Sequence, residues 1–140
     1  MMIRNLSRRS LVVAALAAAS LILVITAAWA QDVPSPLKKS MSSERGAYLI
    51  DAKGMTLYIF DKDKEPGKSV CYGECAKSWP PYAPEAGEPE AVSPLTVITR
   101  DDGTKQYAYK GRPLYYYAKD SSPGDVNGEG VGKAWWIVEP

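Results

Sequence analysis

The chain has 140 residues, with 17 Lys and Arg against 16 Asp and Glu, and it contains no histidine. This near-neutral balance lacks the basic stripe that nucleic-acid-binding proteins present, so we expect no nucleic-acid partner. The absence of histidine excludes the commonest general base and metal ligand, every Ser-His or Cys-His nucleophile, and C-x-x-C-H haem attachment.

The first thirty residues have the pattern of an export signal. Arginines precede an apolar run over residues 11–28, and the run ends in Ala28-Trp29-Ala30, whose small residues suit signal peptidase. We therefore predict a signal peptide over residues 1–30 and a periplasmic or secreted location in a bacterium. Two alternatives stay open, because the run is long enough for an uncleaved membrane anchor and Arg8-Arg9 resembles a twin-arginine signal.

The mature chain is predicted to be one domain after a linker. Removal of residues 1–30 takes away three arginines and no acid, which leaves 14 basic against 16 acidic residues. This charge gives no polybasic membrane patch, and no cysteine lies directly after the apolar run, so we expect no lipid anchor and no membrane insertion after cleavage. Residues 31–45 are rich in Pro, Ser and Lys without apolar periodicity, which indicates a linker. Residues 46–140 are long enough for one domain with its own core.

Short β-prone runs separated by turn residues fill this domain. D-G and K-G steps between β-branched and aromatic runs are hairpin signals. The expected strands lie at residues 47–51, 56–60, 95–100, 106–109 and 114–117. The connection over residues 80–94 carries five prolines and is expected to be extended. No segment keeps a helical period over three turns, so the predicted class is all-β.

The chain contains an internal repeat. GMTLYIFDKDKEPG at residues 54–67 aligns without gaps on GRPLYYYAKDSSPG at residues 111–124. Continued in the same register, the alignment places Trp79 on Trp136. We predict two tandem pseudo-repeats of β-hairpins, at about 46–82 and 95–139, which bury their apolar faces against each other as a small sandwich or barrel.

Two aspartates, Asp63 and Asp120, follow corresponding strand ends in the two copies and precede a Pro-Gly step. A carboxylate at such a position accepts backbone N–H bonds from the turn that follows it. The functional alternative is a paired-carboxylate site, which requires the two side chains to lie close together in the fold.

Each copy carries the same spacing of a tyrosine, a second aromatic residue and an aspartate. The six residues are Tyr58, Phe60 and Asp63 in the first copy and Tyr115, Tyr117 and Asp120 in the second. Together with CYGECAKSWPP, they resemble the Y-x-(F/W/Y)-x-x-D and C-x-x-x-C-x-x-x-W-P-P patterns of a bacterial family of secreted repeat proteins and predicted lipoproteins. The resemblance covers about residues 46–138. It implies an extracytoplasmic location and a tandem β-repeat, but no activity.

Cys71 and Cys75 are the only cysteines of the chain. Outside the cytoplasm two nearby cysteines are expected to be oxidised, and closing this short loop restricts the unfolded chain by roughly 2 kcal/mol. We therefore predict a structural disulfide. A redox pair is the alternative, although the C-x-x-C spacing that lowers a thiol pKa is absent. Metal binding by the two sulfurs is a further alternative.

The segment DVNGEG at residues 125–130 resembles the first half of a calcium-binding loop. The fifth position is a glutamate, and Trp136 occupies the twelfth position, where a bidentate glutamate belongs. The candidate calcium ligands are Asp120, Asp125, Asn127 and Glu129. A turn built from Gly, Asn and Asp without a metal is the alternative interpretation.

The aromatic residues suggest a binding surface. Amphipathic rings stack on sugars or dock protein partners, and although most are expected in the core, Trp79, Tyr82 and Trp135 are the candidates for exposure. Because no catalytic constellation is complete, we predict a non-enzymatic, cofactor-free binding or interaction module of the cell envelope, with an envelope protein or glycan as partner. The alternatives are an extracytoplasmic redox or electron-transfer accessory that uses Cys71 and Cys75, and a calcium-stabilised adhesion-type domain.

Overall fold

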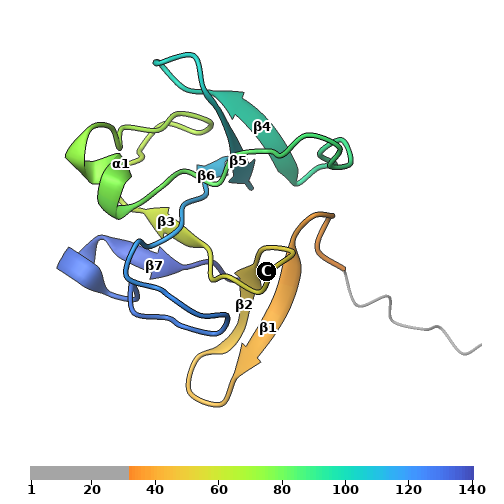
Figure 1. Ribbon diagram of the computed structural model, residues 1–140, viewed down its shortest axis with the longest axis vertical. Helices are drawn as coiled ribbons and strands as arrows, with labels where there is room; N and C mark the ends of the chain where they lie inside the picture. The colour runs from red at the N-terminus through yellow and green to blue at the C-terminus, as the bar shows by residue number, and fades with distance from the viewer. Residues whose placement is uncertain (1–31) are drawn as a thin grey trace, which may run out of the picture. The chain divides into compact units, whose positions relative to one another are not determined.

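A computed structural model describes residues 32–140, and the predicted signal peptide lies outside them. The elements, in chain order, are β1 (Lys38–Ser42), β2 (Gly46–Ile50), β3 (Tyr58–Phe60), α1 (Glu74–Ser78), β4 (Leu95–Thr99), β5 (Lys105–Tyr109), β6 (Arg112–Pro113), the 3-10 turn η1 (Val131–Lys133) and β7 (Trp135–Ile137) (Figure 1). This arrangement confirms the all-β class, with one five-residue helix added. No helix within residues 32–140 is long and apolar enough to cross a membrane.

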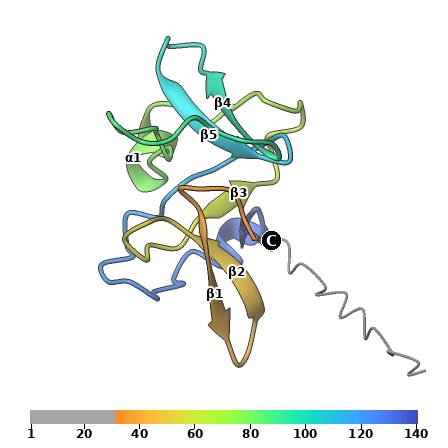
Figure 2. The same ribbon diagram turned by 90° about the vertical axis from the view of Figure 1, so that its right-hand side faces the viewer.

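The strands form three small antiparallel sheets, β1-β2, β3-β7 and β4-β5-β6. The β1-β2 and β4-β5 hairpins lie at opposite ends, with β3 between them (Figure 2). The β4-β5 turn shows why the sequence folds locally in this way. The Asp102 carboxylate accepts the Thr104 N–H at 3.0 Å, and Gly103 takes a φ of 85°, a left-handed conformation that glycine adopts without strain.

The predicted linker over residues 31–45 is wrong from residue 38 onward, because β1 lies inside it. This strand pairs with β2 over all five residues, from Lys38 opposite Ile50 to Ser42 opposite Gly46. Leu37, directly before the strand, is buried in the core. The segment lacks apolar alternation because its side chains are mostly exposed, and backbone pairing to β2 holds it in place.

The two repeats exchange their closing segments. At the centre the backbones of Tyr58 and Tyr115 pair with each other, with N–H to O distances of 2.8 and 2.9 Å. Ile137, from the end of repeat two, lies opposite Tyr58 in repeat one. Conversely, Pro81, from the end of repeat one, lies opposite Tyr115 in repeat two. Each central tyrosine is therefore paired with the closing segment of the other repeat, and the arrangement has pseudo-two-fold symmetry.

This exchange corrects the sequence alignment of the closing segments. Tyr115 follows Tyr58 by 57 positions, whereas Ile137 follows Pro81 by only 56. One residue is therefore missing from the second copy ahead of its closing strand. The counterpart of Trp79 is Trp135, and the predicted match with Trp136 is wrong by one residue.

Two clusters make up the core. The first is rich in leucine and centres on Leu49, Leu57 and Leu114, all three fully buried. The second is mainly aromatic and contains both central tyrosines, Tyr58 and Tyr115. Both clusters draw residues from both repeats, so the core is shared between the repeats.

Candidate functional site

The Tyr-to-Asp spacing that both copies share produces a reciprocal pair of hydrogen bonds between the repeats, here called the lock. The Tyr58 hydroxyl donates to Asp120 Oδ2 at 2.6 Å, and the Tyr115 hydroxyl donates to Asp63 Oδ2 at 2.7 Å. The tyrosine of each copy thus bonds to the aspartate of the other copy. The second oxygen of each carboxylate accepts the backbone N–H seven residues later in its own copy, at 2.8 Å in repeat one and 2.9 Å in repeat two.

These hydrogen bonds define the chemistry of the four side chains. Burial raises the pKa of Asp63. Burial is the main cause of the raised pKa of Tyr58, and the hydrogen bond to Asp120 raises it further. Burial is also the main cause of the raised pKa of Tyr115. Both phenols therefore stay protonated as donors. The predicted role of each aspartate as an acceptor for its turn is present, and both carboxylates use their oxygens for a tyrosine and a backbone N–H rather than for each other.

The aromatic residues at the third motif position, Phe60 and Tyr117, take part in a stack of rings that crosses between the repeats. Phe60 stacks on Trp135 with ring centres 4.0 Å apart, Trp135 on Trp79 at 3.8 Å, and Trp79 on Tyr117 at 4.1 Å. Each motif aromatic residue lies on the tryptophan of the other copy, and the two tryptophans stack on each other. The motif aromatic residues therefore hold the repeats together.

The prediction of an exposed aromatic binding surface is wrong. Trp79 and Trp135 are each only 5% exposed and Tyr82 only 3%. The tryptophans are covered because they form the centre of the stack, and Tyr82 packs against the rings of Tyr107 and Tyr116. In the Trp-Pro-Pro segment Trp79 is buried, whereas Pro80 and Pro81 are partly exposed, and Pro81 pairs with Tyr115.

The predicted disulfide is present. Cys71 and Cys75 are bonded across the start of α1, with Cα atoms 5.3 Å apart, and Cys71 is fully buried. In repeat two Gly128 occupies the position of Cys71. A Cβ atom there would lie 2.8 Å from atoms of the Trp79 and Tyr58 rings, so close packing of the lock requires glycine.

A buried arginine, which the sequence patterns did not single out, supports the disulfide loop. Arg100 is 4% exposed, and its Nη1 donates to Ser69 Oγ at 2.8 Å and to Gln106 Oε1 at 2.7 Å. Its Nη2 donates to the carbonyl of Cys71, and the Tyr72 ring lies 4.4 Å away. The bonds join residues up to 31 positions apart, which no local pattern reveals. Because both terminal nitrogens of the guanidinium bond within the fold, we assign the charge a structural role.

The three carboxylates among the four candidate calcium ligands accept hydrogen bonds within the fold. Asp125 Oδ2 accepts the backbone N–H groups of Ser121 and Ser122, both at 3.0 Å. Glu129 Oε2 accepts the N–H of Ile137 at 2.6 Å, and Asp120 belongs to the lock. In the part of the chain that the structure describes, no three acidic, cysteine or histidine side chains gather as metal ligands. The segment forms turns, as its Gly, Asn and Asp residues favour.

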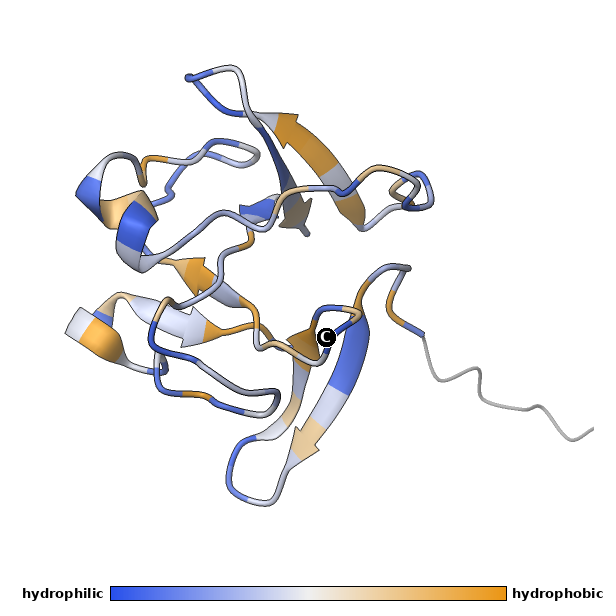
Figure 3. Ribbon diagram, in the orientation of Figure 1, coloured by the Kyte–Doolittle hydropathy of each residue, from blue (hydrophilic) through white to orange (hydrophobic). Residues whose placement is uncertain are grey.

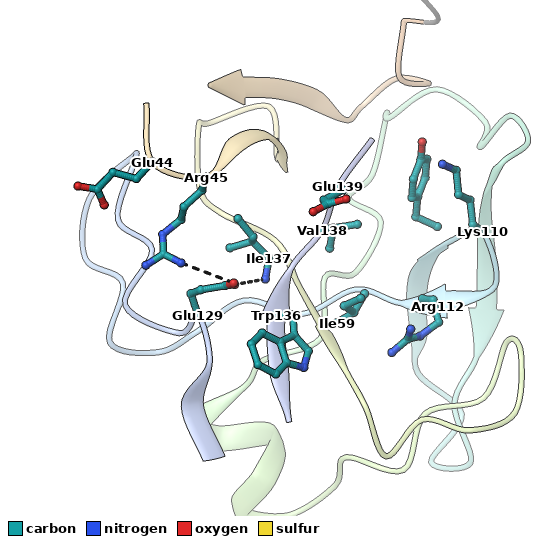
Figure 4. Close-up of a pocket in the computed structure, with 11 residues that line it drawn as sticks. Glu44, Arg45, Ile59, Lys110, Arg112, Glu129, Trp136, Ile137, Val138 and Glu139 are labelled. Atoms are coloured by element: carbon teal, nitrogen blue, oxygen red, sulfur yellow. Dashed lines mark hydrogen bonds and ion pairs between the residues drawn. The ribbon is translucent and has the colours of Figure 1, made fainter. Parts of the chain in front are cut away.

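A pocket of about 640 Å³ lies on the outer face of the β3-β7 sheet (Figure 4). Its apolar floor consists of Ile59, Trp136, Ile137 and Val138. The Trp136 indole N–H donates to Asp61 Oδ2 at 2.8 Å, which fixes the orientation of the ring. The site thus combines a preformed apolar surface with an aromatic ring that cannot turn freely.

Charged side chains surround this floor. Arg45 and Glu129 form an ion pair at 3.6 Å on one side, where Glu129 also holds the edge of β7 (Figure 4). On the other side Arg112 lies 3.8 Å from Asp61. Lys110 contacts the Tyr109 ring at 5.1 Å, and within residues 32–140 it has no ion-pair partner. The pocket therefore has a basic end that can receive an anionic group.

Sequence reasoning did not find this pocket. Its walls come from the β1-β2 turn, β3, the β5-β6 turn, β7 and Glu129, which are distant in the sequence. The sequence patterns singled out Trp136 only as the counterpart of Trp79 and as the twelfth position of the calcium-loop-like segment. A useful signal was present in β3 and β7, where Ile59 and Trp136 face each other across the pairing and are only partly buried.

Comparison with known proteins adds a family match. The model of a family described as a secreted repeat of unknown function matches the chain twice, over residues 39–83 and 96–139. The first match includes β1 from its second residue, in agreement with the structural repeat. Neither the curated proteins nor the solved structures gave a match.

Proposed function

Because the chain belongs to this family of secreted repeats, we propose that it is a non-enzymatic binding module of the bacterial cell envelope whose ligand site is the Trp136 pocket. In this proposal residues 1–30 are the export signal, and the module works in the periplasm or outside the cell. The pocket in Figure 4 is the observation that carries the proposal.

The pocket has the features of a ligand site. Binding pockets are typically 300–1,000 Å³ in volume, with an apolar or aromatic lining and a few polar groups that fix orientation. At about 640 Å³, with a fixed indole on its floor and a charged rim, this pocket fits that description. The tyrosines, aspartates and tryptophans that recur in both copies, in contrast, are buried within the core.

The chemistry of the rim favours an envelope glycan that carries carboxylates. The Trp136 N–H is already used by Asp61, so the ring offers its flat apolar surface, on which a sugar ring can stack. Arg112 and Lys110 lie at one end, and guanidinium and ammonium groups bind carboxylates through charge-assisted hydrogen bonds. Glu44 and Glu139 supply acceptors for hydroxyl groups.

Binding is favoured over the redox alternative. A redox pair cycles between thiol and disulfide through an accessible, activated sulfur. Cys71 is fully buried in the closed disulfide, and its loop is held by Arg100. We therefore assign the disulfide to stability.

The test is calorimetric titration of the purified protein with soluble muropeptides, which carry both sugar rings and carboxylates. We expect Trp136→Ala to weaken binding about tenfold, which corresponds to 1.4 kcal/mol, and Lys110→Gln to weaken it with reduced salt dependence. Lys77→Gln is the matched control, because Lys77 is an exposed lysine outside the pocket. Absence of muropeptide binding, or equal affinity for the wild type and Trp136→Ala with both proteins folded, would refute the proposal.

A further inference from the structure

Strand β4 is an unpaired sheet edge. It bonds to β5 on one side only. The bonds from the Arg100 N–H to Thr104 O at 2.8 Å and from the Lys110 N–H to Pro94 O at 2.9 Å show that the even-numbered residues face β5. In an antiparallel pair the residues between them direct their N–H and C=O groups away from the partner. Val97 therefore points both groups outward, and no described residue bonds to them.

The edge is open and uncharged. Val97 is 43% exposed, and Thr96 and Thr99 are also exposed. No residue of Leu95–Thr99 carries a charge. Proteins normally protect such edges with lysine, proline or a bulge, because an unprotected edge pairs with another strand.

The other repeat shows what such protection looks like in the same fold. Leu49 and Tyr107 are structural counterparts, since each accepts an N–H from the corresponding leucine of its repeat, at 3.1 and 2.9 Å. Lys39 lies opposite Leu49, and Val97 lies opposite Tyr107. The edge strand of repeat one therefore has a lysine where β4 has a valine. Figure 3 shows the contrast, with hydrophilic colour on the first part of β1 and mainly hydrophobic colour on β4.

We propose that β4 pairs antiparallel with β4 of a second copy of this chain, centred on Val97. In this arrangement the outward N–H and C=O groups of β4 in one copy meet the outward C=O and N–H groups of β4 in the other. The two Val97 residues exchange both N–H···O bonds, and the Thr99 N–H of each copy meets the Leu95 C=O of the other. The Leu95 N–H is already bonded to Val92 O at 3.0 Å, and this pairing leaves it in place.

A second copy fits this edge better than a different protein does. The strand presents no charge for a distinct partner to complement, whereas two-fold pairing uses one patch on both copies and closes at a dimer. The two Val97 side chains also meet on the same face of the new sheet, and apolar pairs of this kind stabilise antiparallel strands. The joined sheet would run β6-β5-β4-β4-β5-β6.

The dimer is independent of the proposed ligand site. None of the residues of β4 lines the Trp136 pocket, so pairing leaves that pocket open. Failure of muropeptide binding would not affect this proposal, and the absence of a dimer would not affect the proposed function.

Sedimentation equilibrium of the purified protein over a range from micromolar to millimolar concentrations tests the pairing. We expect the average mass to rise toward twice that of the monomer. Val97→Lys, which introduces the residue type of the counterpart strand, should weaken association at least tenfold. Met41→Lys is the matched control, since Met41 is exposed on the other edge strand, and it should leave association unchanged.

Amide hydrogen exchange measured at low and high concentration locates the interface. The amides of Val97 and Thr99 should become protected as concentration rises, whereas the Met41 amide should not. A monomer at every concentration would overturn the proposal. A dimer that Val97→Lys leaves intact, with unprotected Val97 and Thr99 amides, would overturn it as well.

Discussion

Replacing Tyr115 by phenylalanine removes one half of the reciprocal lock and leaves its packing in place. The Tyr115 ring is fully buried. Phenylalanine keeps this ring, so the change leaves only the small space of the lost hydroxyl. That hydroxyl donates to Asp63 Oδ2 and contacts Ser69 Oγ, each at 2.7 Å. A hydrogen bond to a charged group contributes about 1.5–3 kcal/mol. We expect Tyr115→Phe to lower the free energy of unfolding by about 2 kcal/mol, which lowers Tm by roughly 8–16 °C in a domain of this size.

The loss should depend on pH in a defined direction. The Tyr115 hydroxyl stabilises the ionised form of Asp63 and so lowers its pKa, although burial keeps that pKa above its ordinary value of 3.8. The variant is therefore most destabilised where Asp63 is ionised in the folded wild type. The difference between the two proteins should shrink as pH falls and the carboxyl group becomes protonated in both.

Thermal and urea unfolding followed by circular dichroism measures both effects. Tyr117→Phe is the matched control, because Tyr117 occupies the next motif position and stacks on Trp79, but its hydroxyl has no hydrogen bond to any described residue. Its Tm should lie within about 2 °C of the wild-type Tm, since removing a hydroxyl that makes no hydrogen bond in the fold costs little stability. If Tyr115→Phe had the same Tm as Tyr117→Phe at every pH, the hydrogen bonds between the repeats would not stabilise the fold.

Three further predictions concern the same core. Cys71→Ser with Cys75→Ser should cost about 2 kcal/mol of stability, because the short disulfide loop restricts the unfolded chain; an unchanged free energy of unfolding in urea denaturation of the double variant would show that the disulfide does not stabilise the fold. Gly128→Ala should cost about 1–3 kcal/mol through overpacking, because its Cβ would lie 2.8 Å from the Trp79 and Tyr58 rings; unchanged stability would mean that the stack yields easily. Finally, because burial raises the pKa of Asp63, the folded protein binds more protons than the unfolded chain just above pH 3.8, so stability should fall as pH rises through this window. Asp63→Asn should flatten that part of the pH profile, and a persistent slope would assign the titration to another group.

The sequence was informative wherever structure depends on local patterns. Turn chemistry such as Asp102-Gly103 located the β4-β5 hairpin, and the gapless match from residue 54 to 67 revealed the repeat. The cysteine spacing indicated the disulfide correctly. The sequence alignment paired Trp79 with Trp136 instead of Trp135. The one-residue deletion escaped notice because Trp135 and Trp136 are adjacent tryptophans, so the alignment still matched tryptophan with tryptophan.

What the sequence did not predict depends on contacts between distant segments. Strand β1 forms because β2 supplies its hydrogen bonds, and a segment reading KKSMS has no apolar alternation to show this. Trp79 was a candidate for an exposed binding surface, yet Trp135 covers it from the other repeat. The pocket at Trp136 and the buried Arg100 likewise draw on residues from several elements.

Whether each repeat is completed by the other is tested most directly by separating them. Residues 32–94 and 95–140 can be produced as two polypeptides, and their ¹H–¹⁵N NMR spectra recorded alone and after mixing. Because the Tyr–Asp bonds, the tryptophan stack and the closing strands all cross between the repeats, neither piece alone should give dispersed signals, and mixing should restore the spectrum of the intact domain. A folded spectrum from either piece by itself would contradict the exchange.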